Sequence, residues 1–151
     1  MTTPPIQNIA VIGLGTIGHS VAQVYAAAGC TVRCFDPDPT TGASLADRVR
    51  TNLKQMASAG LSSPDEIEHV VSRFVICDSE VEAVSGAEFV SEAAAEDLPI
   101  KQALFARLEN HIDRYTILAS NTSTYPMTQI SRDMVHPDRA LGTHPFNPPH
   151  L

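Results

Sequence analysis

The sequence has few basic residues, no long apolar run and only three cysteines, and each shortage argues against a class of protein. Ten Lys and Arg stand against seventeen Asp and Glu, which gives a formal net charge of −7 over 151 residues. The basic residues are scattered, so we expect no nucleic-acid partner. No apolar run approaches the length of a membrane span, and the N-terminus lacks the basic and apolar regions of a signal peptide. We therefore expect no membrane partner and a cytoplasmic location.

The cysteines are odd in number and match no metal-ligand spacing, so we expect neither a metal nor a disulfide framework. Cys34 and Cys77 fall in predicted strands, and we interpret them as buried free thiols in a reducing compartment. The chain has no internal repeat, and 43% of its residues are hydrophobic. These features predict one globular domain over residues 1–151.

Apolar patterns predict strands that alternate with helices along the whole chain. The expected strands are 7–12, 31–35, 74–77, 88–93, 115–119 and 139–143. The expected helices are 16–28, 41–59, 64–72, 79–84, 98–112 and one that starts at 126–130. This alternation predicts an α/β fold with a Rossmann-type, doubly wound parallel sheet made of two mononucleotide-binding halves.

A glycine motif between the first expected strand and helix is the most informative segment. It places Gly13, Gly15 and Gly18 after the apolar run 9–12. We interpret Gly13 as permitting a tight turn, Gly15 as allowing backbone close to a pyrophosphate, and Gly18 as letting the helix pack on the strand. The alternative is a tight strand-to-helix turn that binds nothing.

The helix after this turn and an acid after the second strand extend the motif. The helix begins with Thr16 and Ile17, whose end of the helix offers free N–H groups and partial positive charge to phosphate. Asp36 stands 23 residues after Gly13, where it can accept hydrogen bonds from both adenosine ribose hydroxyls. No Lys or Arg is among the next four residues, so NAD is favoured over NADP as the cofactor. The alternative is a solvated turn carboxylate.

Polar residues follow the last three expected strands. They are Glu96, the segment 121–124, and His144 with Asn147. Ligands of open parallel sheets sit beyond the carboxyl ends of the strands, so we expect these groups near a ligand. A neutral imidazole at His144 can take the proton of an alcohol as hydride leaves the carbon. The alternative for His144 is a loop histidine that is hydrogen-bonded to nearby backbone. His150 stands close to it in the sequence, but the two histidines have no third ligand, so we expect no metal site there.

Four segments of the chain together carry a family resemblance: Val11–Gly18, Glu92–Lys101, Ala119–Ser123 and Gly142–Pro148. They resemble the N-terminal NAD-binding domain of the 3-hydroxyacyl-CoA dehydrogenase family, and the last two are far more specific than the glycine motif. The resemblance implies reversible oxidation of a 3-hydroxyl group to a 3-ketone with NAD as hydride acceptor, within fatty-acid metabolism.

The resemblance also implies roles for individual residues. His144 matches the general base, and Ser123 matches a serine that hydrogen-bonds near the substrate oxygen and the nicotinamide. Asn147 matches an asparagine that helps to hold the nicotinamide half and the active-site geometry. Glu96 and Lys101 match a pair near the nicotinamide ribose.

The sequence departs from the family pattern after its last motif. The family orients its histidine with a glutamate about a dozen residues later, and this sequence ends at Leu151, before that position. The helical C-terminal domain that closes the site and carries the dimer contacts is also absent. We therefore expect a fragment of a longer enzyme that is a homodimer at full length.

A second departure concerns the handle on the substrate. Family members that bind CoA use a serine and lysines on the helical arm after the second strand, and Arg48–Met56 keeps basic residues but not that serine. The turn Gly15–Ser20 and the ending His144–Pro149 resemble the branch of L-gulonate 3-dehydrogenase (lambda-crystallin) and carnitine dehydrogenase. That branch oxidises small 3-hydroxy acids without CoA.

Three hypotheses of different classes follow. The first is an NAD-dependent oxidoreductase acting on a small-molecule 3-hydroxy substrate. The second is a cofactor-binding module that is inert in isolation, and the third is a structural or sensory NAD-binding protein without chemistry. The joint presence of Ser123 and His144 favours the first over the third.

Overall fold

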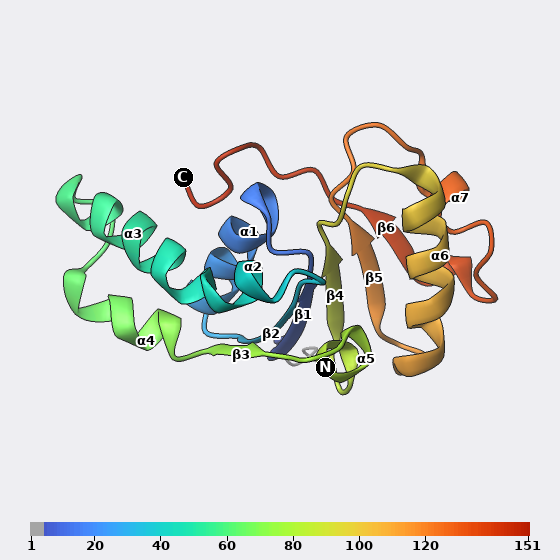
Figure 1. Cartoon of the computed structure of the whole chain (residues 1–151), viewed down its shortest axis with the longest axis horizontal. Coiled ribbons are helices and arrows are strands. Elements are labelled where there is room, and N and C mark those ends of the chain that lie inside the picture. The colour runs from blue at the N-terminus through green and yellow to red at the C-terminus, as the bar shows by residue number, and fades with distance from the viewer. Residues whose placement is uncertain (1–4) are drawn as a thin grey trace.

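The computed structural model describes residues 5–151, and a parallel sheet forms its central layer (Figure 1). The strands of this part of the chain are β1 (Asn8–Ile12), β2 (Thr31–Phe35), β3 (Phe74–Ile76), β4 (Phe89–Glu92), β5 (Ile117–Ser120) and β6 (Ala140–Gly142). All neighbours are parallel, in the order β3-β2-β1-β4-β5-β6. This order confirms the predicted Rossmann-type sheet, whose ligand crevice lies where the strand order reverses, between β1 and β4.

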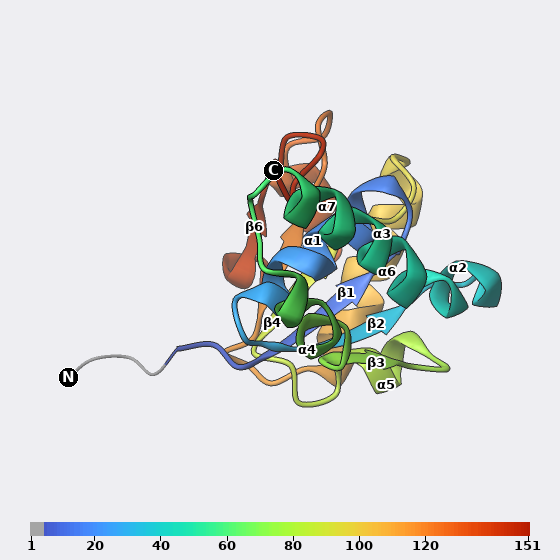
Figure 2. The same cartoon turned by 90° about the vertical axis from the view of Figure 1, so that its left-hand side faces the viewer.

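Helices cover both faces of the sheet, as Figures 1 and 2 show. One face carries α1 (Thr16–Ala27), α3 (Leu45–Ser58) and α4 (Ile67–Val71), and the other carries α5 (Glu80–Val84), α6 (Leu98–Leu108) and α7 (Met127–Ile130). Ile9 and Val11 enter the first core, whereas Ala10 and Ile12 enter the second. Successive strand residues point to opposite faces, so the continuous apolar run of β1 supplies both cores.

The prediction of a single helix over 41–59 is wrong about where the helix starts and about its continuity. The chain instead forms α2 (Pro39–Ala43) and α3, joined at Ser44, which has φ −83° and ψ −6°. Asp38 starts α2 earlier than expected because its Oδ1 accepts the backbone N–H of Thr40 at 2.9 Å, with Pro39 in the first turn.

The remaining expected elements agree with the structure to within one or two residues at most ends, the usual uncertainty of such boundaries. The helix expected over 98–112 ends as α6 at Leu108 and continues as a 3₁₀ turn, η2 (Glu109–His111). Two further 3₁₀ turns are η1 (Pro64–Glu66), which precedes α4, and η3 (Pro137–Arg139), which precedes β6.

The carboxyl ends of all strands meet at one edge of the sheet, which lies at the top of Figure 1. After β6 the chain runs back along this edge to α1, where His150 Nδ1 lies 3.2 Å from Ser20 Oγ. The three cysteines are free and buried, as expected, although Cys77 lies just beyond β3. Each helix within residues 5–151 is too short or too polar to cross a bilayer.

Candidate functional site

The turn between β1 and α1 has little room for side chains where it meets β4. Gly13 has φ +89°, and a Cβ there would lie 2.6 Å from the carbonyl oxygen of Ala93. A Cβ on Gly18 would lie 1.8 Å from the carbonyl oxygen of Gly13. Gly13 thus makes the tight turn and Gly18 the close helix packing that the sequence predicts. A Cβ on Gly15 would meet nothing within 4 Å, so open space lies over this residue.

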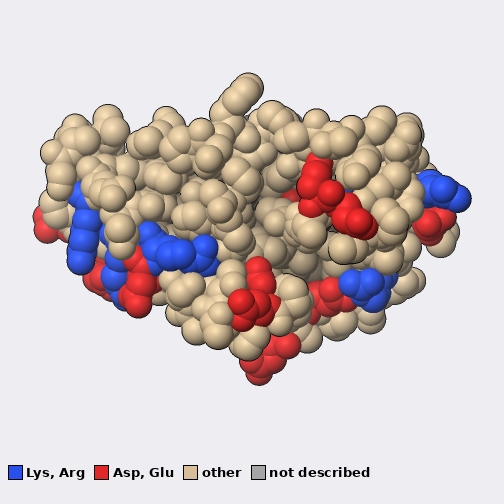
Figure 3. Space-filling view, turned by 45° about the horizontal axis from the view of Figure 1, so that its top comes forward, with Lys and Arg blue, Asp and Glu red and all other residues tan. Residues whose placement is uncertain are grey.

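The first turn of α1 faces this open space with backbone N–H groups. Gly15 is the N-cap residue, no side chain caps the helix, and Thr16 is exposed. Ile17 lines an adjoining cavity of about 210 Å³. Figure 3 brings the side of the molecule where the strands end toward the viewer. It shows acidic side chains near the middle of the view and most basic ones toward its left and right. The helix N-terminus therefore supplies the positive field that suits a pyrophosphate.

Asp36 follows β2 and fastens the glycine turn. Its Oδ2 accepts the N–H of Leu14 at 2.7 Å, and its Oδ1 accepts the N–H of Asp38 at 2.9 Å. Each oxygen retains a further lone pair. Asp36 lines a cavity of about 500 Å³ together with Gly13 and Gly15. It is therefore a turn carboxylate, as the alternative interpretation held, and also a wall of a cavity that suits an adenosine ribose.

Arg48 of α3 supports the same turn, a role that the sequence did not reveal. Its Nη1 donates to the carbonyl oxygen of Leu14 at 2.7 Å, and its Nη2 donates to that of Thr41 at 2.9 Å. Its Nε donates to Ser44 Oγ at 3.1 Å. All three nitrogens of the guanidinium are thus committed to the fold around the glycine turn.

Ser123 and His144 come together because they follow the neighbouring strands β5 and β6. Ser123 Oγ lies 2.9 Å from His144 Nε2, and both residues are exposed. In the tautomer that carries its proton on Nδ1, the imidazole accepts the serine hydroxyl through Nε2. The Phe146 ring packs edge-on against that of His144, with centroids 5.5 Å apart. The histidine contacts a distant side chain rather than nearby backbone, which favours the general-base interpretation.

Asn147 is not brought into this pair. Its side chain is exposed, and within residues 5–151 no hydrogen bond joins it to another residue. Asn121, which belongs to the predicted polar segment 121–124 but was given no role of its own, is better placed in the structure. Its Nδ2 donates to Ser91 Oγ at 3.0 Å and its Oδ1 accepts the hydroxyl of Thr143 at 2.5 Å. It joins the ends of β4, β5 and β6, and its position directly after β5 is the signal that marks it.

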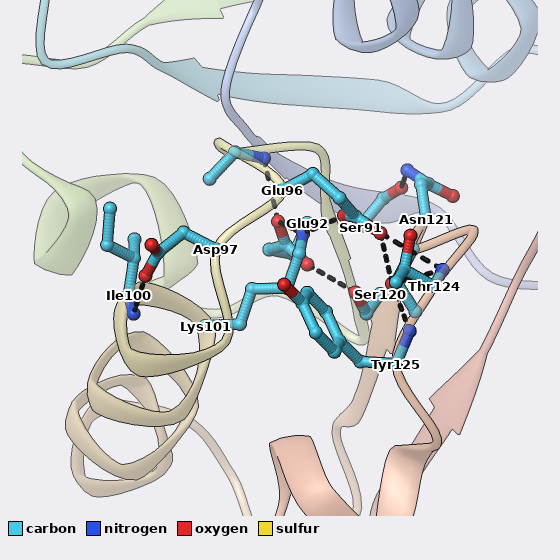
Figure 4. A network of polar contacts seen from close by, with 12 residues as sticks. Ser91, Glu92, Glu96, Asp97, Ile100, Lys101, Ser120, Asn121, Thr124 and Tyr125 are labelled. Atoms are coloured by element: carbon cyan, nitrogen blue, oxygen red, sulfur yellow. Dashed lines mark hydrogen bonds and ion pairs between the residues drawn. The ribbon is translucent and has the colours of Figure 1, made fainter.

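Glu96 and Lys101 meet in a polar network, and Glu92, to which the sequence gave no role, anchors it (Figure 4). Lys101 Nζ lies 2.7 Å from Glu92 Oε1 and 3.2 Å from Glu96 Oε2. The side chains of Glu92 and Lys101 are each 1% exposed, whereas that of Glu96 is 40% exposed. Of the predicted pair, Glu96 is therefore open to a ligand and Lys101 is nearly covered.

Glu96 also binds the loop that follows β5. Its Oε1 accepts the hydroxyl of Thr122 at 2.6 Å and the backbone N–H groups of Ser123 at 3.0 Å and Thr124 at 3.1 Å. Burial raises the pKa of Glu96, but the hydrogen bonds from Thr122, Lys101 and Ser123 and the charge of Lys101 outweigh it and lower the pKa to about 2. Glu96 is therefore ionised at neutral pH and ties Ser123 to the start of α6.

Among the described residues, no three His, Cys, Asp or Glu side chains gather closely enough to hold a metal ion. A glycine turn at the switch point, an uncapped helix start and an acid after β2 define the class of the chain, a dinucleotide-binding domain.

Comparison with known proteins narrows this class to one family. The family model described as 3-hydroxyacyl-CoA dehydrogenase, NAD binding domain, matches residues 8–151. The chain belongs to this family, and NAD is its cofactor.

Relatives of the chain include dehydrogenases for different substrates. It is 35% identical over 143 residues to a probable 3-hydroxybutyryl-CoA dehydrogenase of Bacillus subtilis, covering 95% of this chain and 50% of the relative. It is 34% identical over 152 residues to an L-carnitine dehydrogenase of Streptomyces coelicolor, covering 100% of this chain and 46% of the relative. The chain thus spans about half the length of these curated relatives.

A solved structure agrees closely with the fold. The crystal structure of 3-hydroxybutyryl-CoA dehydrogenase from Escherichia coli K12 superposes with a TM-score of 0.91 at 32% identity, covering 98% of this chain and 31% of that one.

Proposed function

We propose that the protein containing this domain oxidises the hydroxyl group of a 3-hydroxyacyl substrate to a ketone, with NAD as its cofactor. The observation that carries the proposal is the 2.9 Å contact between Ser123 Oγ and His144 Nε2, at the same sheet edge as the glycine turn. A base and a hydroxyl donor at this place suit an alcohol substrate beside a bound dinucleotide.

In the proposed reaction, His144 removes the hydroxyl proton of the substrate through Nε2. Ser123 donates a hydrogen bond to the same substrate oxygen and so positions it against the imidazole. The glycine turn and Asp36 would hold NAD, which would supply the acceptor for the hydride that leaves the carbon as the C=O bond forms. The O–H and C–H bonds thus break toward separate acceptors, and charge does not accumulate on the substrate oxygen.

The remaining site residues are assigned to the cofactor. Gly13, Gly15 and Gly18, with the N–H groups of Thr16 and Ile17, hold the pyrophosphate. Asp36 holds the adenosine ribose. Glu96 and Lys101 lie by the nicotinamide ribose, and Asn147 supports the nicotinamide half. The open space over Gly15 and the spare lone pairs of Asp36 support these assignments.

A second candidate is the oxidation of a small 3-hydroxy acid that carries no CoA. On α3, the guanidinium of Arg48 binds the glycine turn, and that of Arg50 pairs with Glu68 at 2.8 Å and Asp47 at 3.0 Å. Of the basic residues on this helix, only Lys54 has no such partner within residues 5–151, which leaves little charge for the phosphates of CoA. Turnover measured in parallel with 3-hydroxybutyryl-CoA, carnitine and gulonate separates the two candidates.

The decisive test replaces His144 with Ala in the full-length gene product. Loss of a positioned general base lowers kcat by about 10²- to 10⁴-fold. The affinity for NADH, measured by fluorescence titration, stays near that of the unmodified protein because the glycine turn is untouched. The matched control is His111→Ala, an exposed histidine in η2. Unchanged kcat in His144→Ala would contradict the assignment.

Further parts of the proposal concern the protein as a whole. We propose that residues 1–151 alone bind NAD without turnover, and that the full-length enzyme is a homodimer. We also place its reaction in cytoplasmic fatty-acid metabolism, which the 3-hydroxybutyryl-CoA dehydrogenase relative and the three free buried cysteines support.

A further inference from the structure

Glu92 is a buried carboxylate that cannot touch a ligand directly, because only 1% of its side chain is exposed. Its Oε1 accepts the N–H of Ala94 and the ammonium of Lys101, both at 2.7 Å. Its Oε2 accepts the hydroxyl of Ser120 at 2.5 Å. The carboxylate at the end of β4 therefore fastens the start of α6 and the end of β5 (Figure 4). Any effect of Glu92 on a reaction must pass through the groups that it holds.

Lys101 passes the effect of Glu92 to the surface of the site. A buried ammonium needs a counter-charge, and Glu92 provides one at 2.7 Å on the covered side. The opposite side of the ammonium meets Glu96 at 3.2 Å. Lys101 thus stands between one fully buried carboxylate and one that is open to solvent.

Glu96 in turn sets the path of the loop that carries Ser123. It binds the N–H groups of Ser123 and Thr124, and the hydroxyl of Ser123 reaches His144. Continuous polar contacts therefore run from the buried carboxylate of Glu92 to the serine–histidine pair. They cross the ends of three neighbouring strands, β4, β5 and β6.

We propose that Glu92 is a positioning residue for the reaction, because it holds Lys101, which holds Glu96, which holds Ser123 in place beside His144. This inference rests on the proposed function. When Glu92 lacks its charge, Lys101 shifts toward Glu96 and the loop of Ser123 loses its fixed support. A displacement of about 1 Å at a reacting group costs up to about 100-fold in rate.

The chain offers a matched control for this role. Glu109, just past α6, is also a buried carboxylate with a cationic partner, which here is Arg139 at 3.3 Å. It binds the backbone N–H groups of Val135 and His136, which precede β6 and so lie at the opposite edge of the sheet. Glu109→Gln therefore disturbs a buried ion pair of the same kind without touching the loop of Ser123.

The test compares Glu92→Gln with Glu109→Gln in the full-length gene product. For each protein, urea unfolding gives the stability, and steady-state kinetics give kcat and the KM for NAD. We expect similar stability losses, but a fall in kcat of about 10- to 100-fold in Glu92→Gln alone. The KM for NAD rises by a smaller factor, because the glycine turn and Asp36 are unchanged. Equal kcat in the two variants would overturn the role of Glu92.

A milder variant covers the case in which Glu92→Gln does not fold. Ser120→Ala removes only the hydroxyl at Glu92 Oε2, and we expect kcat to fall by about 3- to 10-fold. A kcat of Ser120→Ala equal to that of the unmodified protein would then contradict the inference. If the unmodified protein itself oxidises no 3-hydroxy substrate, the proposed function is wrong; if it does and the variants match it, only the role of Glu92 is wrong.

Discussion

The two ends of α6 each hold a buried acid–base pair, at opposite edges of the same sheet. In its first turns, Lys101 pairs with Glu92 at 2.7 Å, and both side chains are 1% exposed. Just past its last turn, Glu109 pairs with Arg139 at 3.3 Å, with side chains 6% and 8% exposed. The first pair lies at the carboxyl ends of the strands, where ligands bind, and the second lies at the amino ends.

The pairs differ in what they fasten. Glu109 accepts two backbone N–H groups of residues 135–136, both at 2.7 Å, and so fixes the path of a loop. Glu92 instead accepts one backbone N–H, that of Ala94, and binds two side chains, those of Lys101 and Ser120. Its contacts continue through Lys101 and Glu96 to the loop beyond β5. The same chemistry therefore serves the architecture at one edge and the geometry of the site at the other.

The sharpest test of this difference removes the cation from each pair. Lys101→Met and Arg139→Met each leave a buried carboxylate without its counter-charge. Each therefore lowers the free energy of unfolding by about 3–5 kcal/mol, measured by urea denaturation. Only Lys101→Met also weakens NADH binding, because Lys101 lines the cavity beside Ile17. An equal loss of NADH affinity in Arg139→Met would show that stability alone explains both effects.

Most of the fold follows from patterns that need no tertiary knowledge. The apolar runs of β1 and β4 and the glycine turn predict a parallel sheet with its switch point after β1. The break at Ser44 was not predicted, although Gly42 stands two residues before it as a breaker and Asp38 offers an earlier cap. The cap at Asp38 starts the helical segment at Pro39, two residues before the predicted start at residue 41.

The site was predictable where it depends on strand ends and not where it depends on buried charge. Ser123 and His144 were expected near each other because their strands end at the same edge, and the structure joins them at 2.9 Å. Glu92 was passed over because its contact with Lys101 forms only when α6 folds back on the sheet. The available signal was an acid at the end of an otherwise buried strand, where a lone charge requires a partner.

A smaller contrast concerns two buried threonines that flank β5. Thr122, beyond its carboxyl end, donates to Glu96 at 2.6 Å, and Thr116, before its amino end, donates to the carbonyl oxygen of Ala87 at 2.7 Å. Replacement of either by Val leaves an acceptor short of a donor and lowers the free energy of unfolding by about 1–3 kcal/mol. Thr122→Val also removes the oxygen that accepts the N–H of Tyr125 at 3.1 Å, so its loss lies toward the upper end of this range. We expect only Thr122→Val to lower kcat, because Thr122 helps to hold the loop of Ser123. A similar loss of kcat in Thr116→Val would contradict the comparison.

The smallest expected effect is the decrease in the free energy of unfolding as the pH falls into the acid range. Burial raises the pKa of Glu109, but N–H groups of residues 135–136 and Arg139 outweigh it and lower the pKa overall. The pKa of Glu96 is also lowered, to about 2. Both groups stabilise the fold fully above the ordinary carboxyl pKa of 4.5, and this stability is lost as the pH falls through the folded value.

The two acids nevertheless differ in how much stability they lose. Glu96 is 40% exposed, so solvent screens its contribution. Glu109→Gln should therefore flatten the fall of stability below the ordinary carboxyl pKa of 4.5 more than Glu96→Gln does. The carboxyl carbon of Glu96, followed by NMR, should titrate near pH 2 in the unmodified protein and at higher pH in Lys101→Met, where the cation is gone. The Glu109 signal should not move in that variant. A Glu96 midpoint near 4.5 in the unmodified protein would mean that the contacts from Glu92 to Ser123 do not persist in solution.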